Sequence, residues 1–492
     1  MRNRSLFIIF FFCFFIPLTT VYCQTFTTGI SRFDSAFNAE KELKITDIIN
    51  RVKLAHPVLS KAKLSESIGK YTVLEKKGQF DPKISVDQFS KNYLDKNYYE
   101  LQSFELKMPT ASPITPEIGF EKNTGENINP EWKTEGSGLS YVGINIDLLK
   151  GLITDSRRTQ YQQSKIFAQQ SILEKRVTQL DIASDIWHDY IDWFIAYSQK
   201  EAYDYGVNLS SQRQEALRSL FIAGGCNGMD TLENHIQLEL FRTSENEWSA
   251  NTFKQRLNMS KHLWLGESTK DKKELFIPIT IKPNIIPSDA GLSILDSLFQ
   301  QAIKFTADQI LAIPDLKYYE LEMNQLALEV RLKKYATLPS LNLKIQTLNP
   351  GFDYGNVDFS NNRLGITFAS PLFLRTERGQ YLKTNAKFKQ YSYSYSFKKH
   401  EIQLKTEALK RQSEVYRKVY LMLINVENGY RDLYNMERDK FDNGDGSIFL
   451  LNTRENRYLS AKIKRIEQHS KYLKSVVEYL RAIGEIDNTI IP

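Results

Sequence analysis

Cysteine is scarce in this chain of 492 residues, and long apolar runs are almost absent. The three cysteines are Cys13, Cys23 and Cys226, and the first two lie in an N-terminal leader. A single thiol in the mature chain cannot form an intramolecular disulfide. Beyond the leader no apolar run reaches the about 20 residues that a membrane-spanning helix requires, which excludes a bundle of transmembrane helices.

The leader itself has the features of a secretory signal. Two early arginines precede an apolar run at 6–18, which is 13 residues long and too short to span a bilayer as a helix. We predict cleavage after Cys23, which removes 1–23 and leaves 24–44 as an N-terminal extension. Lipid attachment to Cys23 is the alternative, although the bulky Tyr22 before it disfavours a lipoprotein site. The exported chain is then either soluble in the periplasm or crosses a membrane as β-strands.

Signatures of catalysis and of nucleotide binding are missing as well. Neither G-x-x-x-x-G-K-[ST] nor G-x-S-x-G occurs, and none of the six histidines has a partner at metal-ligand spacing. The segment 442–446, DNGDG, lacks the alternating carboxylates and the closing Glu of a calcium loop, so a tight turn explains it better. We therefore predict that the protein is not an enzyme and has no catalytic, cofactor-binding or metal site.

The charge balance disfavours nucleic acid as a partner. The formal net charge is +7, from 65 basic and 58 acidic residues, and the Lys and Arg residues form no dense block with interleaved aromatic side chains. A mixed, solvated surface accounts for this better than a nucleic-acid patch. We expect no nucleic acid partner.

Proline is missing from two very long segments, and glycine is rare in them. Residues 154–222 contain no Pro and one Gly, and residues 376–441 contain no Pro and two Gly. At 1.5 Å per residue the first segment forms a helix of about 100 Å, which is far longer than a compact domain holds.

Two details of these segments bear on the helix prediction. Leu173, Leu180, Trp187 and Phe194 recur every seven residues, which predicts a coiled-coil seam. Residues 388–397, FKQYSYSYSF, alternate as in a strand. We assign them to a helix because their neighbours are helical and β-branched residues are absent.

The chain contains the same pattern twice. Two pairs of prolines share a spacing of 25 residues: Pro57 with Pro82, and Pro314 with Pro339. The tetrapeptides GINI at 143–146 and GITF at 365–368 continue the series in the same order. We interpret 45–265 and 297–486 as a tandem duplication. A Pro-containing linker at 266–296 joins the repeats, and a tail at 487–492 follows them.

Each repeat reads as helix, strand, strand, very long helix, turn and helix. Apolar and polar residues alternate at 84–87, 141–148, 341–346 and 364–369, which predicts four strands. A sheet with one polar face fits an ordinary half-buried sheet and equally a transmembrane barrel. In the first repeat the shorter helices, at 45–77 and 229–265, together match the long helix in length. We expect them to lie end to end beside it.

These motifs in this order resemble the TolC-like outer-membrane efflux protein family, over roughly 45–486. The resemblance is carried by HPVL and IPDL at the helix starts, FDP and LPSL at the helix-to-strand junctions, GINIDLLKGLITDSRR (143–158), GITFASPLFLRTERGQ (365–380), and the turns FIAGGCNGMDTLE (221–233) and FDNGDGSIFLLNTRE (441–455). It implies an α+β membrane protein. Three copies, each giving four strands, would close a 12-stranded transmembrane β-barrel, continued by a long periplasmic α-helical barrel of coiled-coil helices.

The resemblance also implies a function. Such proteins are exit ducts in the cell outer membrane, and they conduct substrates passively in tripartite efflux or type I-like secretion systems. The implied partners are two further copies of the chain, a periplasmic adaptor, an inner-membrane pump of the RND or ABC type, and outer-membrane lipid. The alternative is a soluble periplasmic coiled-coil adaptor or scaffold without a barrel. The repetition of both strands and helices disfavours it.

Two sets of site residues follow from the resemblance. The glycines of the two turns would form the periplasmic tip that docks the adaptor: Gly224, Gly225, Gly228, Gly444 and Gly446. Acidic residues near the turns would close the periplasmic entrance: Asp230, Glu437, Asp439, Asp442 and Asp445. Where the family places acids in the second repeat, this chain has Leu450 and Thr453. The tract 88–137 is longer than a hairpin needs, and we expect prolonged strands with a surface loop there.

Overall fold

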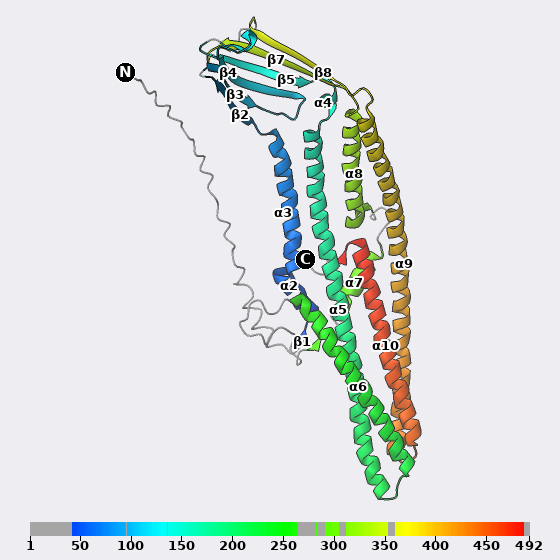
Figure 1. Cartoon of the computed structure of the whole chain (residues 1–492). Coiled ribbons are helices and arrows are strands. Elements are labelled where there is room, and N and C mark those ends of the chain that lie inside the picture. Colours follow the sequence, from blue (N-terminus) through cyan, green and yellow to red (C-terminus); the bar gives the residue numbers. More distant parts are fainter. Residues whose placement is uncertain are drawn as a thin grey trace, which may run out of the picture.

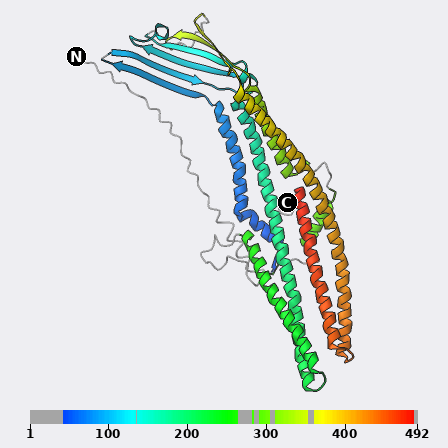
Figure 2. The same ribbon diagram turned by 45° about the vertical axis from the view of Figure 1, so that its right-hand side comes forward.

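The structure is a computed structural model that describes residues 42–94, 96–134, 136–263, 282–283, 291–304, 311–352 and 360–486. It is elongated, with a curved antiparallel sheet at one end and long helices that extend away from it (Figures 1 and 2). The predicted signal peptide, most of the linker at 266–296 and the C-terminal tail lie outside the described residues.

Two helices run through most of the length of the molecule, which confirms the prediction from missing proline. Helix α5 (Ser156–Ile222) has 67 residues and α9 (Arg375–Asp442) has 68. The alternating segment 388–397 lies within α9 and is helical, as predicted. Ser394 and Ser396 donate their hydroxyl protons to the carbonyls four residues earlier, so their polar groups are satisfied inside the helix.

Shorter helices lie end to end beside α5. Helix α6 (Gly228–Leu263) ends where α2 (Ile45–Ala55) packs, and α3 (Pro57–Lys77) continues toward the sheet. The Arg51 Nε donates to the Leu263 carbonyl at 2.8 Å and fixes this junction. The expected single helix at 45–77 is wrong, because Pro57 holds His56 in an extended conformation and splits the segment in two.

The second repeat is built in the same way. Helix α10 (Ile448–Ile483) ends at Gly484, where α8 (Pro314–Tyr335) begins, and Arg481 pairs with Asp315 at 3.0 Å across the junction. Helix α7 (Gly291–Ala302) packs against α10 and starts inside the predicted linker. The described helices therefore form four parallel tracks: α5, α9, α6 followed by α3, and α10 followed by α8.

The largest hydrophobic core lies at the level where the stacked helices meet. Leu180 and Trp187 of the predicted seam are buried there, together with Tyr190 and Trp193 of α5 and Phe299 of α7. Nearby, β1 (Glu42–Leu43) pairs in parallel with β6 (Lys282–Pro283). The core thus ties the two repeats together midway along the helices.

His469 of α10 also lies in this core, and it gives a test of the packing. Its ring stacks on Tyr420 with centroids 4.4 Å apart and meets Phe194 edge-on. Burial, with a contribution from the positive charge of Arg465, lowers the pKa of the imidazole to about 4. The folded protein therefore stays neutral at His469 at pH values where an unfolded chain would take up a proton.

We expect the stability to fall as the pH falls from about 6.5 to about 4, by up to about 3 kcal/mol from this group. The full contribution is present above the unfolded pKa, because neither state is then protonated. Thermal melts followed by circular dichroism should show a flatter pH dependence in His469→Phe. The exposed His400 serves as the control, and His400→Phe should leave the profile unchanged. If the thermal midpoint changed equally with pH in the wild-type protein and in both variants, the prediction would be contradicted.

The sheet has six strands in the described residues, so the expectation of four per chain is wrong. The strands are β2 (Lys83–Tyr93), β3 (Lys96–Lys107), β4 (Ile114–Thr124), β5 (Leu139–Asp147), β7 (Ser340–Pro350) and β8 (Asn362–Ala369), in that spatial order. Every neighbouring pair is antiparallel. The tract 88–137 prolongs β2 and forms two further strands, β3 and β4. Pro116 and Gly119 obscure the alternation in β4, since both residues disfavour strands.

The register gives the sheet one apolar face and one polar face. The apolar face carries Ile84, Val86, Phe104, Leu106, Ile118, Phe120, Val142, Ile144, Leu343, Ile345, Leu364 and Ile366. The polar face carries Ser85, Asp87, Glu105, Lys107, Glu117, Glu121, Asn145, Lys344, Gln346 and Arg363. Separately, none of the described helices combines the length and the apolar character needed to cross a bilayer.

Candidate functional site

A network of polar side chains crosses the middle of the polar face. The Glu117 side chain of β4 is 1% exposed. It accepts a hydrogen bond from Gln346 at 2.7 Å and forms an ion pair with Lys344 at 3.1 Å, both in β7. The intervening strand β5 has Gly143 at this level. A Cβ there would lie 2.6 Å from the Gln346 Cγ. Glycine at 143 therefore lets side chains two strands apart meet.

The network extends to the edge strand β8. Both terminal nitrogens of Arg363 donate to the Glu121 carboxylate at 3.2 Å, and one of them also reaches the Gln346 Oε1 at 3.4 Å. A bidentate guanidinium–carboxylate pair is among the stronger polar contacts in proteins. Strand β4 is thus tied to β7 and to β8 by charged groups on one face.

The connection between β4 and β5 folds over the same face. Asn123 donates its N–H to the Thr134 Oγ1 at 2.9 Å and its side-chain amide to the Trp132 carbonyl at 3.1 Å. A cavity of about 930 Å³ lies between this segment and the sheet, lined by Phe89, Trp132 and Arg363 among others. The predicted surface loop therefore exists, and it sits at the end of the sheet away from the helices.

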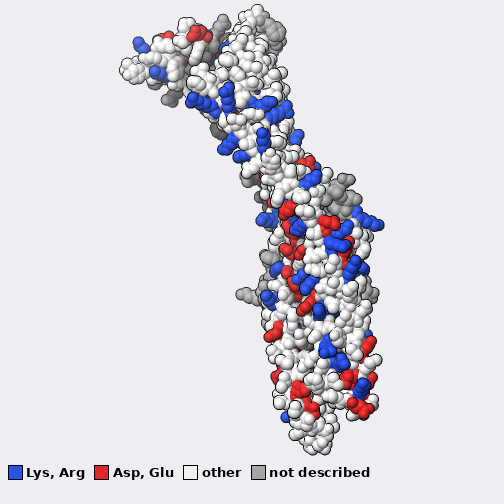
Figure 3. Space-filling view, turned by 90° about the vertical axis from the view of Figure 1, so that its right-hand side faces the viewer, with Lys and Arg blue, Asp and Glu red and all other residues white. Residues whose placement is uncertain are grey.

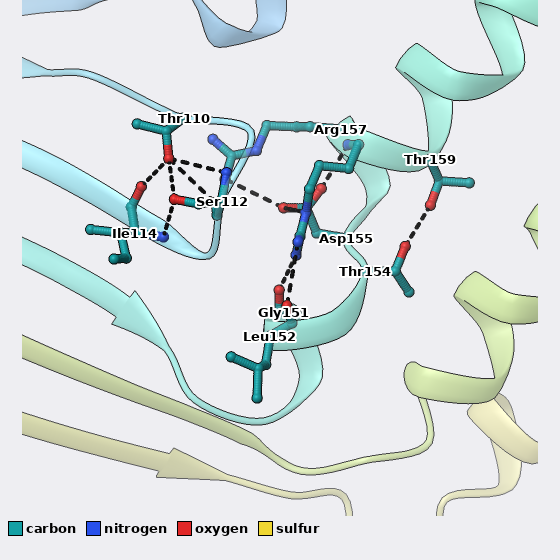
Figure 4. Close-up of polar contacts among 10 residues, drawn as sticks. Thr110, Ser112, Ile114, Gly151, Leu152, Thr154, Asp155, Arg157 and Thr159 are labelled. Carbon is teal, nitrogen blue, oxygen red and sulfur yellow. Dashed lines mark hydrogen bonds and ion pairs between the residues drawn. The ribbon is translucent and has the colours of Figure 1, made fainter.

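The opposite end of the sheet meets the helices through a polar junction (Figure 4). The Asp155 side chain caps α5 by accepting the Arg158 N–H at 2.8 Å, and it pairs with the Arg158 guanidinium at 3.3 Å. Arg158 also donates to the carbonyls of Gly151 and Leu152 in α4 (Lys150–Ile153). The turn between β3 and β4 lies beside this junction in Figure 4. These contacts fix the direction in which α5 leaves the sheet.

The two turns at the far ends of the long helices have the same backbone geometry. Gly224 has a φ of +76° and donates to the Phe221 carbonyl at 3.1 Å, while Gly225 donates to Leu220 at 2.8 Å. In the second repeat Gly444 has a φ of +85° and donates to the Phe441 carbonyl at 3.0 Å. These bonds define the Schellman motif, which requires a left-handed residue and so favours glycine.

The other predicted tip glycines differ in role. Gly228 is the first residue of α6, and Gly225 does not have a positive φ. Gly446 approaches the backbone of Phe441 so closely that a Cβ would lie 2.7 Å from the Phe441 Cα. Glycine is therefore required at 224 and 444 by the positive φ, and at 446 by the close approach of the Phe441 backbone.

The acidic residues predicted for the entrance lie at the same end of the molecule, in or next to the two turns. Asn227 caps α6 by accepting the Asp230 N–H at its Oδ1 at 2.9 Å, and the Asp230 carboxylate accepts the Asn227 N–H at 3.3 Å in return. Asp439, Asp442 and Asp445 are exposed, and Glu437 is half-buried. The structure thus brings all five to one end and makes Asp230 the partner of Asn227 in a capping box.

Sequence reasoning missed a buried ion pair close to this end. Arg213 of α5 and Glu455 of α10 are 2.7 Å apart, and their side chains are 7% and 1% exposed. Arg213 also donates to the Asn452 Oδ1 at 2.7 Å. Burial raises the pKa of Glu455, and Arg213 partly offsets that rise. No spacing rule connects positions 213 and 455, so only the packing of the two hairpins reveals the pair.

Other kinds of site can be checked in the described part of the chain. It holds no group of three or more His, Cys, Asp or Glu side chains that could bind a metal ion. The Cys226 thiol donates to the Leu217 carbonyl at 3.4 Å and packs in the tip.

Solved structures match nearly the whole chain. The outer membrane channel CmeC of Campylobacter jejuni is 13% identical, with a TM-score of 0.63, over 92% of this chain and 87% of that one. VceC, an outer membrane protein of Vibrio cholerae, is 11% identical, with a TM-score of 0.61, over 92% and 97%. The Neisseria gonorrhoeae outer membrane channel MtrE is 12% identical, with a TM-score of 0.61, over 89% and 88%. The chain has the TolC-like fold.

The comparisons of sequence, unlike those of structure, found no relative. No protein-family model and no curated protein sequence matches the chain. Two of the matched structures are named as outer membrane channels. Relative to the four strands per chain that the resemblance implied, this TolC-like chain has two more.

Proposed function

We propose that the chain is an outer-membrane channel, the exit duct of a tripartite efflux or type I-like secretion system. The observation that carries the proposal is the six-stranded sheet, which has one apolar and one polar face and continues into helices of about 100 Å. An exposed apolar face is unfavourable in water but is the outer surface of a barrel in lipid. The likeness to solved outer membrane channels supports this assignment.

In this proposal three copies form the channel. In a lone sheet the two edge strands have no neighbouring strand on their outer side, which lipid cannot tolerate. Strands β2 and β8 are these edges, and almost all of their residues are exposed in the single chain. A ring of three copies pairs every edge, and the four helical tracks of each copy then form a tube. In a soluble adaptor this sheet would expose its apolar face and its open edges to water, which is unfavourable.

The charge distribution suits a membrane boundary at the base of the sheet. Lys and Arg side chains gather just below the sheet in Figure 3, and acidic side chains are more frequent farther along the helices. Basic residues lie at the ends of α8 and α9 that are nearest to the sheet: Arg331, Lys333, Lys334, Arg375, Arg378 and Lys383. Basic residues at this level favour contact with anionic lipid headgroups.

The helical tips form the periplasmic entrance in this proposal. The two Schellman turns, at Gly224 and Gly444, dock a periplasmic adaptor, which connects the duct to an inner-membrane pump of the RND or ABC type. The acidic side chains near the turns narrow the entrance: Asp230, Glu437, Asp439, Asp442 and Asp445. Export to this location relies on the cleaved signal peptide at 1–23.

Adjacent positions in β8 give a matched test of the membrane assignment. Ile366 lies on the apolar face and is 69% exposed, whereas Thr367 lies on the polar face. We expect Ile366→Arg to cost about 2–4 kcal/mol if the residue sits near the bilayer midplane, and to strongly reduce the trimer recovered in the outer membrane. Thr367→Arg should insert normally. Purified wild-type protein should form ion-conducting pores in planar lipid bilayers.

The soluble alternative makes the opposite prediction. Wild-type protein and both variants would then appear together in the soluble periplasmic fraction, and purified protein would conduct no current. That result would refute the channel.

A further inference from the structure

We propose that the β3–β4 hairpin is part of the barrel wall, so that three copies close a barrel of 18 strands rather than 12. This inference rests on the proposed channel function. It assigns the hairpin, which has no counterpart in the second repeat, a role in setting the width of the pore. The partner at each open edge of the sheet is a second copy of this chain.

The first argument is the position of the hairpin in the sheet. Strand β3 pairs with β2 along the whole of β2, from Lys83 to Tyr93. Strand β4 pairs with β5 from Ile114 to Glu121. The hairpin therefore lies between the two strands of the first repeat. A flap outside the wall would instead leave β2 and β5 paired with each other. The strands have 12 and 11 residues, enough for the about 9–11 that a tilted membrane strand requires.

The second argument is the continuity of the apolar face. Phe104 and Leu106 of β3 and Ile118 and Phe120 of β4 lie in register with Val86 and Ile84 of β2. The row of Ile84, Leu106 and Ile118 continues into β5 with Val142, whereas the row of Phe120 meets Ser140. Farther along β5, Ile144 and Ile146 carry the apolar face on to Ile345 and Leu343 of β7. An apolar band that crosses all six strands is what a lipid-facing wall requires, whereas a loop in water would not carry it.

The third argument is that the polar face locks the hairpin to the rest of the sheet. Glu117 of β4 is buried against Lys344 and Gln346 of β7, and Glu121 pairs with Arg363 of β8. The ring of Tyr141 in β5 lies across Gly119 in β4, where any Cβ would collide with it. These contacts need the hairpin at its place in the wall.

The fourth argument compares the circumferences of the two halves of the molecule. Four helical tracks per chain give twelve in a trimer, and at an axis spacing of about 8–10 Å they need a ring of about 96–120 Å. Eighteen strands at a spacing of about 4.8 Å and a tilt of about 40° give a circumference of about 113 Å, whereas twelve give about 75 Å. The circumference of the 18-stranded barrel therefore falls within the range of the helical tube.

The edges of the sheet also permit this closure. Successive strands alternate in direction from β2 to β8, so β8 of one copy is antiparallel to β2 of the next. Both edges expose large residues of the apolar face, including Val86 at 71% and Ile366 at 69%. Pairing of edges therefore continues both the ladder and the apolar band.

Disulfide cross-linking in intact cells tests the inference, with Cys226 first replaced by serine. Phe120→Cys with Ser140→Cys places two thiols directly opposite each other on β4 and β5, so we expect rapid oxidation to a cross-link. Val86→Cys with Ser140→Cys is the matched control. Two strands separate these positions, about 14 Å at the usual spacing, so no cross-link should form. Electron cryo-microscopy of the trimer in lipid nanodiscs should then show 18 strands.

The outcomes separate this inference from the channel itself. A trimeric barrel of 12 strands, with the control pair cross-linked and the first pair free, would overturn the inference and leave the channel intact. A protein that forms no membrane-embedded trimer would refute the proposed function.

Deletion of 96–134 removes the β3–β4 hairpin and connects β2 directly to β5 at the end of the sheet away from the helices. If the deleted chain assembles, its barrel should have 12 strands, and an unchanged barrel width would also overturn the inference.

Discussion

Replacing Gly444 or Gly224 with proline is expected to abolish export while leaving the membrane sheet assembled. Proline fixes φ near −65°, whereas the structure requires +85° at Gly444 and +76° at Gly224. The substitution also removes the N–H that bonds to the Phe441 or Phe221 carbonyl. The turn must therefore take another shape. Since the sheet lies at the opposite end of the molecule, it should fold and insert as before.

The experiment compares drug resistance or secretion in cells with the amount of trimer in the outer membrane. Gly225→Ala is the matched control, because Gly225 lies in the same turn without a positive φ and has ordinary space for a Cβ. Gly224→Ala should be intermediate, since a left-handed alanine costs only about 1 kcal/mol. Normal export by both proline variants would remove the adaptor-docking role from the tips.

Arg213→Ala is expected to destabilise the end of the helical bundle by about 3–5 kcal/mol, because it leaves the buried Glu455 carboxylate without its partner. The loss should appear as a lower thermal midpoint and as faster proteolysis near the tip. Asn452 would also lose its contact with the guanidinium. The effect is larger than that of an exposed ion pair, which contributes about 1 kcal/mol or less.

Two further measurements identify the charge as the cause. The double variant Arg213→Leu with Glu455→Leu removes both charges and should recover most of the stability, since a buried pair can be replaced by apolar side chains at little cost. Burial raises the pKa of Glu455, and in the single variant no guanidinium offsets that rise. The single variant should therefore become more stable as the pH falls, because protonation removes the unpaired charge. A double variant as unstable as the single one would contradict this explanation.

Local signals in the sequence predicted the helices well and the sheet less well. The two long helices follow from the absence of proline, and their bounds lie within two residues of those expected. A helix does start at Pro57, as HPVL predicts, but 45–77 was wrongly expected to be one continuous helix. Strands β3 and β4 were missed because charged residues, Pro116 and Gly119 weaken their alternation.

The candidate site shows the same division. The tip turns could be predicted, because a glycine after a long helix is a local signal that needs no partner elsewhere. The network around Glu117 could not be predicted, since it joins β4 to β7 over more than 200 residues and depends on Gly143 between them. The docking and entrance roles of the tip residues stay predictions.

The sequence alone determined the features that arise from neighbouring residues: the length of the helices, the two turns and the alternation of four strands. Only the tertiary structure decided the order and number of the strands and the pairing of Arg213 with Glu455. The physical reason is range. Helix formation and capping depend on groups a few residues apart, whereas the place of a strand and the partner of a buried charge depend on surfaces that meet only when distant segments pack.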